Sequence, residues 1–141
     1  MRKSNIARAF VAFAIIVLES LPYGAVLNFG EPTSDGSIGF IRKTYSYFSL
    51  TPFGYANFGP FLTAVLSCVL LCLLVISIFI EKNALQNTAY IVSIFALFAS
   101  LMPLLLGVRN YSVCGLAISL LLAVEIIIYL SIRRNHLNYT N

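Results

Sequence analysis

Tryptophan is absent from this chain, histidine occurs once and cysteine three times. The single His136 has no His, Cys, Asp or Glu at ligand spacing, so we expect no metal site. Cys68 and Cys72 are four residues apart within an apolar stretch, which differs from the Cys-x-x-Cys of disulfide-forming membrane enzymes. Nucleophile elbows, phosphate-binding loops and dinucleotide fingerprints are also missing. The sequence therefore predicts a protein without enzymatic activity or cofactor.

Charge is scarce as well, at 10% of the residues, with a net charge of +4. The basic residues stand at the ends of apolar stretches and form no single patch, which argues against a nucleic-acid partner. A cytoplasmic amino terminus would put Arg2, Lys3, Arg8, Lys82, Arg133 and Arg134 inside and Arg42, Lys43 and Arg109 outside. This excess inside favours both termini in the cytoplasm, and we expect a bacterial-type plasma membrane.

Long apolar stretches dominate what remains, since 60% of the chain is hydrophobic. A helix needs roughly 20 apolar residues to cross a bilayer. Lipid offers no hydrogen-bond partners, so a spanning segment must satisfy its own backbone groups, as an α-helix does. The sequence predicts one all-α domain over residues 1–141, an integral membrane four-helix bundle in contact with the lipid bilayer. Its expected spans are residues 9–29, 59–80, 88–108 and 113–132, with an outer loop at 30–58.

A secretory signal peptide is the competing interpretation of the first stretch, because basic residues precede it and Tyr23-Gly24-Ala25 ends in small residues. A good small-x-small cleavage site is missing, and Glu19 fits such a segment poorly. Cleavage would leave three spans, whose orientation would have to be argued again.

Two carboxylates fall inside the predicted spans, where an ionisable group costs at least ~2.5 kcal/mol unless it is paired or hydrated. Glu19 and Glu125 have similar predicted depths, so they could face each other and share a proton. Alternatively, each protonated carboxyl donates a hydrogen bond to a neighbouring helix, or a partner subunit supplies a cation. Serines within or near the spans are candidate partners: Ser20, Ser67, Ser77, Ser93, Ser100 and Ser119.

The segment directly after Glu19 predicts a break in the first helix. Pro22 lacks an amide donor and clashes with the carbonyl of Leu18, so the helix should kink or unwind there. Ser20 and Pro22 thereby join Glu19 and Glu125 in a candidate intramembrane polar site. Small residues in spans one and four predict that these helices are neighbours, and a tight turn predicts the same for spans three and four.

The outer loop is rich in aromatic residues, which favour the headgroup zone of a membrane. One interpretation is a belt lying on the outer leaflet, and another is a cap over the bundle that covers a cavity or offers a docking surface. A short strand near residues 44–49 is compatible with the alternation there but is not predicted firmly. The candidate interaction surface consists of Tyr45, Tyr47, Phe48, Phe53 and Tyr55.

These features favour a small non-enzymatic membrane subunit or accessory protein that binds a membrane-protein partner, or a second copy of itself, through the outer loop. The main alternative is an oligomeric proton-linked carrier or channel that uses the intramembrane carboxylates. A weaker alternative is an enzyme whose intramembrane carboxylate acts on a lipid-borne substrate.

Overall fold

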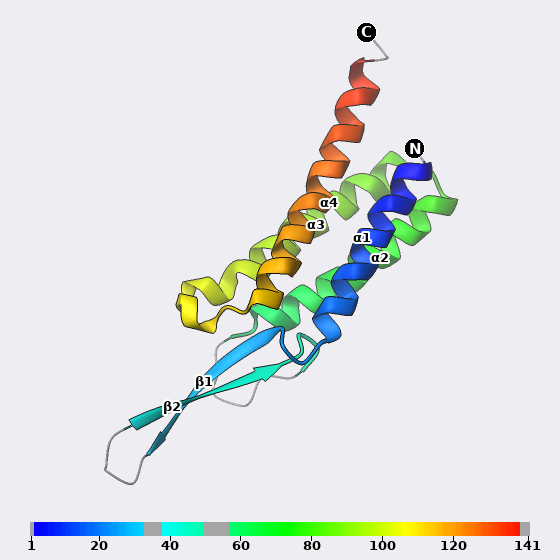
Figure 1. Ribbon diagram of the computed structural model, residues 1–141. Coiled ribbons are helices and arrows are strands. Elements are labelled where there is room, and N and C mark those ends of the chain that lie inside the picture. Colours follow the sequence, from blue (N-terminus) through cyan, green and yellow to red (C-terminus); the bar gives the residue numbers. More distant parts are fainter. Residues whose placement is uncertain (1, 33–37, 50–56, 139–141) are drawn as a thin grey trace.

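The computed structural model describes residues 2–32, 38–49 and 57–138, which form helices and one β-hairpin (Figure 1). Among these described residues, three helices are long and apolar enough to cross a membrane, namely α2, α3 and residues Val113–Arg134 of α4. The elements in chain order are α1 Arg2–Ser20, β1 Ala25–Pro32, β2 Ile38–Tyr45, α2 Gly59–Phe79, α3 Asn83–Leu105, the 3-10 helix η1 Val108–Asn110 and α4 Val113–Asn138.

The helix contacts form a closed ring, because α1 packs against α2 and α4, and α3 packs against the same two helices. The predicted contacts of the first helix with the fourth, and of the third with the fourth, are therefore confirmed. Both ends of the chain lie at one end of the helices, and the hairpin leaves from the opposite end (Figure 1). We call the end of the helices where the chain begins and ends the terminal end, and the opposite end the hairpin end.

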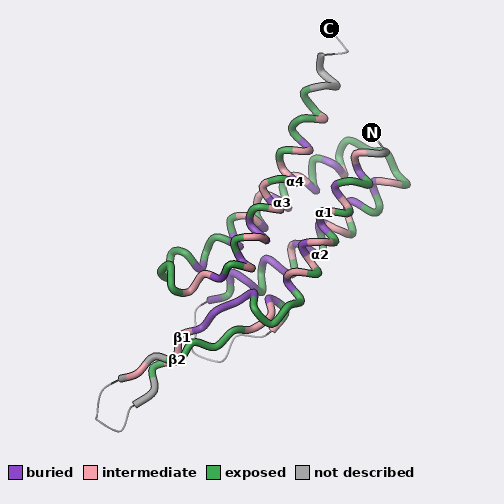
Figure 2. The backbone as a smooth tube through the Cα atoms, viewed as in Figure 1, coloured by how far each residue is buried: buried purple, intermediate pink, exposed green. Residues whose placement is uncertain are grey.

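Buried and exposed positions alternate along the helices (Figure 2), and many large apolar side chains are exposed while several alanines are buried. Ala12, Ala64 and Ala96 are 0% exposed. By contrast, Phe10 is 74% exposed and Phe98 is 68% exposed. Such an outward apolar surface is consistent with an integral membrane protein.

The first predicted span and the all-α class both need correction. We expected a helix over 9–29 and a loop over 30–58, but α1 ends at Ser20 and two strands follow. Pro22 cannot donate a backbone hydrogen bond, and the chain turns from Leu21 to Gly24. The apolar residues after this turn then pair across a sheet instead of continuing the helix. The fold is mostly helical with a small two-stranded sheet.

The hairpin is antiparallel, with Ala25 opposite Tyr45 at its root and Pro32 opposite Ile38 at its far end. Because side chains alternate along a strand, Asn28 and its cross-strand neighbour Arg42 share one face. This face turns toward η1, since the Asn28 amide donates a hydrogen bond of 2.7 Å to the Asn110 side-chain oxygen. The root is thereby tied to the helices, while the far half extends beyond them (Figure 1).

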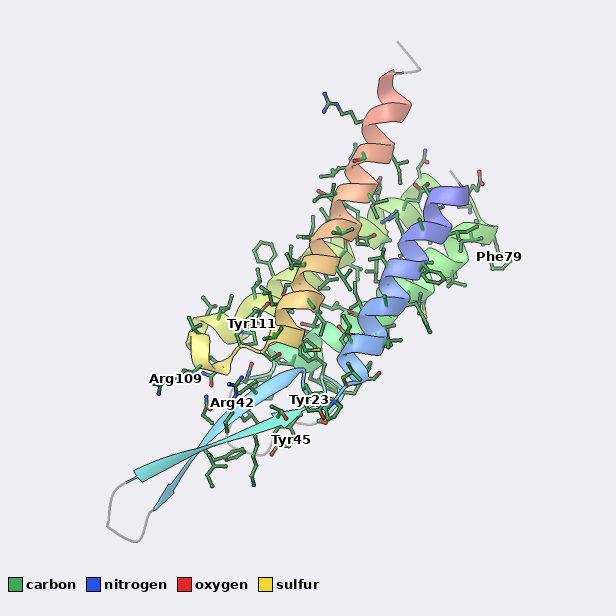
Figure 3. All side chains as sticks on the ribbon, in the orientation of Figure 1. Tyr23, Arg42, Tyr45, Phe79, Arg109 and Tyr111 are labelled. Atoms are coloured by element: carbon green, nitrogen blue, oxygen red, sulfur yellow. The ribbon has the colours of Figure 1, made fainter. Side chains whose placement is uncertain are left out.

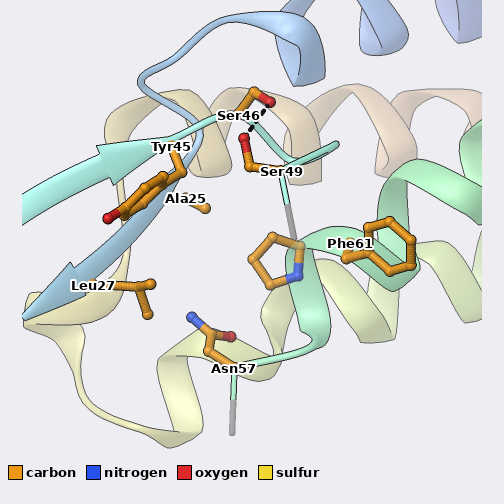
Figure 4. Close-up of a pocket in the computed structure, with 8 residues that line it drawn as sticks. Ala25, Leu27, Tyr45, Ser46, Ser49, Asn57 and Phe61 are labelled. Atoms are coloured by element: carbon orange, nitrogen blue, oxygen red, sulfur yellow. Dashed lines mark hydrogen bonds between the residues drawn. The ribbon is translucent and has the colours of Figure 1, made fainter. Parts of the chain in front are cut away.

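The opposite face of the hairpin root lies over the start of α2 and leaves a small cleft there (Figure 4). The cleft has a cavity volume of about 10 Å³, which is hardly more than one water molecule needs and far less than small-molecule sites occupy. It is therefore a packing gap rather than a ligand pocket. Its lining consists of Ala25, Leu27, Tyr45, Ser46, Ser49, Asn57, Pro60 and Phe61.

Candidate functional site

A buried ion pair joins the first and last helices. The Arg8 guanidinium donates from Nε and Nη2 to Oε1 of Glu125, at 2.8 Å and 2.6 Å. Both side chains are 0% exposed. Because the pair is neutral as a whole, it avoids the cost of a single charge inside an apolar bundle.

Aromatic and amide side chains surround this pair. The Arg8 guanidinium carbon lies 4.9 Å from the centre of the Tyr129 ring, a cation–π contact. The Tyr129 hydroxyl donates to the side-chain oxygen of Asn87, and its ring stacks on Tyr90 at 4.5 Å between centroids. We call Arg8, Glu125, Tyr129, Asn87 and Tyr90 the charge centre; it joins α1, α3 and α4.

The charge centre leaves some polar atoms without a partner. Nη1 of Arg8 and Oε2 of Glu125 are buried and accept or donate no hydrogen bond among the described residues. Gln86, one turn before Tyr90 on α3, has a buried and equally unpartnered side-chain nitrogen. Nearby at the terminal end, Asn5 donates to the carbonyl of Ser77 at 3.3 Å, which links α1 to α2.

The second intramembrane carboxylate, Glu19, has a different environment. Its Oε1 accepts a hydrogen bond of 2.8 Å from the Ser67 hydroxyl on α2. Ser67 was one of the predicted serine partners, which this contact confirms, but the serine hydroxyl donates where we expected the carboxyl to donate. The other carboxylate oxygen, Oε2, is buried without a partner.

Glu19 and Glu125 do not face each other, so that alternative from the sequence is wrong. Glu125 binds Arg8, which precedes Glu19 by 11 residues on the same helix. That separation corresponds to about 16 Å along the helix axis, so the two carboxylates lie at different depths. The depth estimate failed because it counted from an inner end at residue 9, whereas α1 begins at Arg2.

Ser20 and Pro22 do not gather around Glu19 as we expected. The Ser20 hydroxyl is exposed and donates to the carbonyl of Ile16 at 2.8 Å, within its own helix. Pro22 is also exposed and lies in the turn after α1. Of the four residues in the predicted polar site, each carboxylate thus has its own partner, and neither partner is Ser20 or Pro22.

Tyr47 brings the segment after the hairpin into the helices. It is only 1% exposed, although we expected it on an outer interaction surface. Its amide donates a 2.9 Å hydrogen bond to the carbonyl of Glu19, which the end of α1 leaves free. Its hydroxyl is hydrogen-bonded with Ser100 on α3, and burial raises the pKa of Tyr47 above its ordinary range.

Two glycines make room for the Tyr47 side chain. A Cβ at Gly24 would lie 2.7 Å from Cδ1 of the ring, and one at Gly115 would lie 2.9 Å from the hydroxyl oxygen. Both separations are shorter than real carbon contacts allow. Gly24 precedes β1 and Gly115 lies on α4, so the ring is held between the hairpin root and a helix.

Hydroxyl groups extend this contact across the hairpin end of the helices. The Ser100 and Ser119 hydroxyls are 2.6 Å apart, and Ser119 in turn lies 2.5 Å from the Tyr111 hydroxyl. Ser112 donates to the carbonyl of Gly24, which ties the start of α4 to the hairpin root. We call the group formed by Glu19, Ser67, Tyr47, Ser100, Ser119 and Tyr111 the hydroxyl layer.

The remaining aromatic residues of the predicted interaction surface differ in exposure. Phe48 is 40% exposed, and Tyr45 is half-buried beside the cleft near exposed Tyr23 (Figure 3). Phe53 and Tyr55 lie outside the described residues, so the surface as predicted is described only in part.

The described residues contain neither a candidate metal site nor a disulfide. No three His, Cys, Asp or Glu side chains there are placed to hold a metal ion. The three cysteines, Cys68, Cys72 and Cys114, are free thiols.

Comparison with known protein families, curated proteins and solved structures finds no match to this chain.

Arg8 is the residue of the candidate site that the sequence did not reveal, because it was counted only as a charge flanking the membrane. A signal was present, since Asn5, Arg8 and Glu19 follow the three- and four-residue spacing of one helix face. All three are buried. A cation on the same face as a buried carboxylate indicates an internal partner.

Proposed function

We propose that all four helices cross the membrane as a bundle, with both termini cytoplasmic and the hairpin outside. The 19 residues of α1 span about 28 Å, close to the thickness of the hydrocarbon layer. Its charges do not oppose this placement, because Arg8 is paired and Glu19 is hydrogen-bonded within the bundle. Its outward face carries exposed Phe10 and Phe13.

Charge at the terminal end supports this orientation. Exposed Lys82 lies in the turn between α2 and α3, and exposed Arg133 and Arg134 lie near the end of α4. These basic residues stand where a cytoplasmic surface would attract them. A bacterial plasma membrane is the setting that we propose.

Within that membrane, we propose that the protein is a non-enzymatic subunit or accessory protein that binds a membrane-protein partner through the hairpin. The observation that carries this proposal is the far half of the hairpin, which extends beyond the helices (Figure 1). No third strand pairs with β1 or β2 among the described residues. Backbone groups along such edges pair readily with an added strand of a partner protein.

The way in which the hairpin root is held by the helices also supports a docking role for the hairpin. An isolated two-stranded hairpin is marginally stable in water. Here the Asn28–Asn110 hydrogen bond and buried Tyr47 hold its root against the helices. The bundle thereby offers a rigid support for a projecting strand pair.

Site-specific photocrosslinking in native membranes tests this proposal. A photoreactive residue replaces Ile41, which is 41% exposed in the far half of β2, and the control carries it at Phe79, which is 78% exposed at the terminal end. We expect a discrete protein adduct from position 41 that position 79 does not give. Adducts with lipid alone at position 41 would contradict the docking function.

A proton-linked carrier is the second candidate, and a specific observation favours it. Glu19 and Glu125 each keep one buried carboxylate oxygen without a partner among the described residues. Intramembrane carboxylates of this kind mark ion pathways in transporters. The variant Glu19→Gln separates the two candidates. A carrier should lose its proton-linked substrate flux in reconstituted vesicles while remaining folded. An accessory protein should show no substrate flux in either form.

A further inference from the structure

Arg42 and Arg109 stand on two segments that come together where the hairpin root adjoins η1. Arg42 shares a strand face with Asn28, and Asn28 is hydrogen-bonded to Asn110, the residue after Arg109. Arg42 and Arg109 therefore lie on two segments that Asn28 links, although 67 residues separate them in the sequence. Both side chains are exposed at the hairpin end (Figure 3).

Neither arginine has a protein counter-charge among the described side chains. The only ion pair there is the one between Arg8 and Glu125. Glu19 is buried against Ser67, and Glu81 lies at the terminal end of the helices. Two exposed guanidinium groups near one another, with no acid paired to them among the described side chains, attract an anion.

Apolar side chains surround this corner in a way that identifies the kind of anion. Leu105, Val108 and Val113 flank Arg109 and are 86%, 80% and 85% exposed. A soluble phosphate gains nothing from such a surface, whereas acyl chains cover it. Cationic groups directly above exposed apolar residues match the boundary between lipid headgroups and acyl chains.

We propose that Arg42 and Arg109 together bind the phosphate of an anionic phospholipid in the outer leaflet. Guanidinium groups suit this ligand because each offers two parallel N–H donors to phosphate oxygens. The lipid joins β2 to η1 and thereby holds the hairpin root against the membrane surface. This site rests on the proposed membrane crossing but not on the protein partner.

The neighbouring Lys43 provides a matched control. It follows Arg42 on the same strand, and its side chain occupies the opposite face. Its ammonium nitrogen lies 5.6 Å from the centre of the Phe29 ring. Removing this charge changes the net charge as an arginine substitution does, without touching the face toward η1.

Native mass spectrometry of the full chain in detergent tests the site, with phosphatidylglycerol and phosphatidylcholine as probes. We expect Arg42→Gln with Arg109→Gln to weaken phosphatidylglycerol binding about tenfold, while Lys43→Gln changes it less than about twofold. Phosphatidylcholine binding stays equal in all forms. An unchanged affinity in the double variant, or an equal loss in Lys43→Gln, overturns the proposal.

Two further arms separate the possible sources of failure. Millimolar inorganic phosphate should leave the lipid adducts in place, and displacement by it would overturn a lipid site in favour of a free-anion site. Thr44→Cys in a chain without other cysteines reports on the membrane crossing, since external labelling is expected there and not at Lys82→Cys. External labelling with unchanged lipid binding would overturn the lipid site alone, whereas no external labelling at Thr44 overturns the crossing on which it rests.

Discussion

The charge centre and the hydroxyl layer each hold one glutamate inside the helices, and they do so by different means. In the charge centre, Glu125 is neutralised by Arg8, and every member belongs to a helix. In the hydroxyl layer, Glu19 accepts a hydrogen bond from a single hydroxyl among the described residues, that of Ser67, and Tyr47 comes from the segment after the hairpin. Charge joins the helices at the terminal end, whereas hydroxyls join the hairpin to the helices at the other.

This difference assigns separate roles to the two regions. The Arg8–Glu125 pair links α1 to α4 directly and closes the ring of helix contacts. The Tyr47 side chain instead transmits any displacement of the hairpin root to α3 and α4, through Ser100 and Gly115. If the proposed partner binds the hairpin, we expect the hydroxyl layer to respond before the charge centre.

The largest effect is expected when the charge pair is broken on one side. Arg8→Leu leaves Glu125 buried without its cation, and removing one member of a buried pair costs about 3–5 kcal/mol. We expect the free energy of unfolding in mixed micelles to fall by that amount. The measurement is equilibrium unfolding monitored by circular dichroism.

The control for this prediction removes both charges. Arg8→Leu combined with Glu125→Leu leaves no uncompensated charge, so most of the lost stability should return. If the double variant were as unstable as the single one, packing and not charge would hold α1 to α4.

A smaller effect is expected from crowding the hydroxyl layer. In Gly24→Ala the new methyl group would lie 2.7 Å from the Tyr47 ring, which is buried and cannot turn away freely. Overpacking of this kind costs about 1–3 kcal/mol. Combining it with Tyr47→Leu should make the two effects strongly non-additive, and simple additivity would show that the methyl group meets something else.

The helices were accessible from sequence because their apolar stretches are long and nearly free of charge. Residues 59–80, 88–108 and 113–132 fall close to α2, α3 and α4. The first span failed because the apolar residues after Pro22 suit a strand as well as a helix. Pairing with residues 38–45, which lie further along the chain, decides between the two, and a local pattern does not contain that pairing.

Some residues of the candidate site could be predicted from the sequence, but the contacts between them could not. Glu19 and Glu125 stood out as carboxylates in apolar stretches, and Ser67 was among the expected partners. The Arg8–Glu125 pair joins residues 117 positions apart, so it depends on which helix faces meet. Tyr47 gave no signal of burial because aromatic residues also favour the membrane surface.

The smallest effect tests whether the Tyr47 hydroxyl or its ring holds the hairpin. Tyr47→Phe keeps the ring and removes the hydrogen bond with Ser100, so we expect a loss of about 1 kcal/mol. Exposed Tyr23→Phe should change nothing. Because burial raises the folded-state pKa of Tyr47, its contribution is complete below the unfolded pKa of about 10 and is lost as the pH rises beyond it. The variant should lack this alkaline loss, and an identical pH profile in both forms would mean that the hydroxyl reaches water.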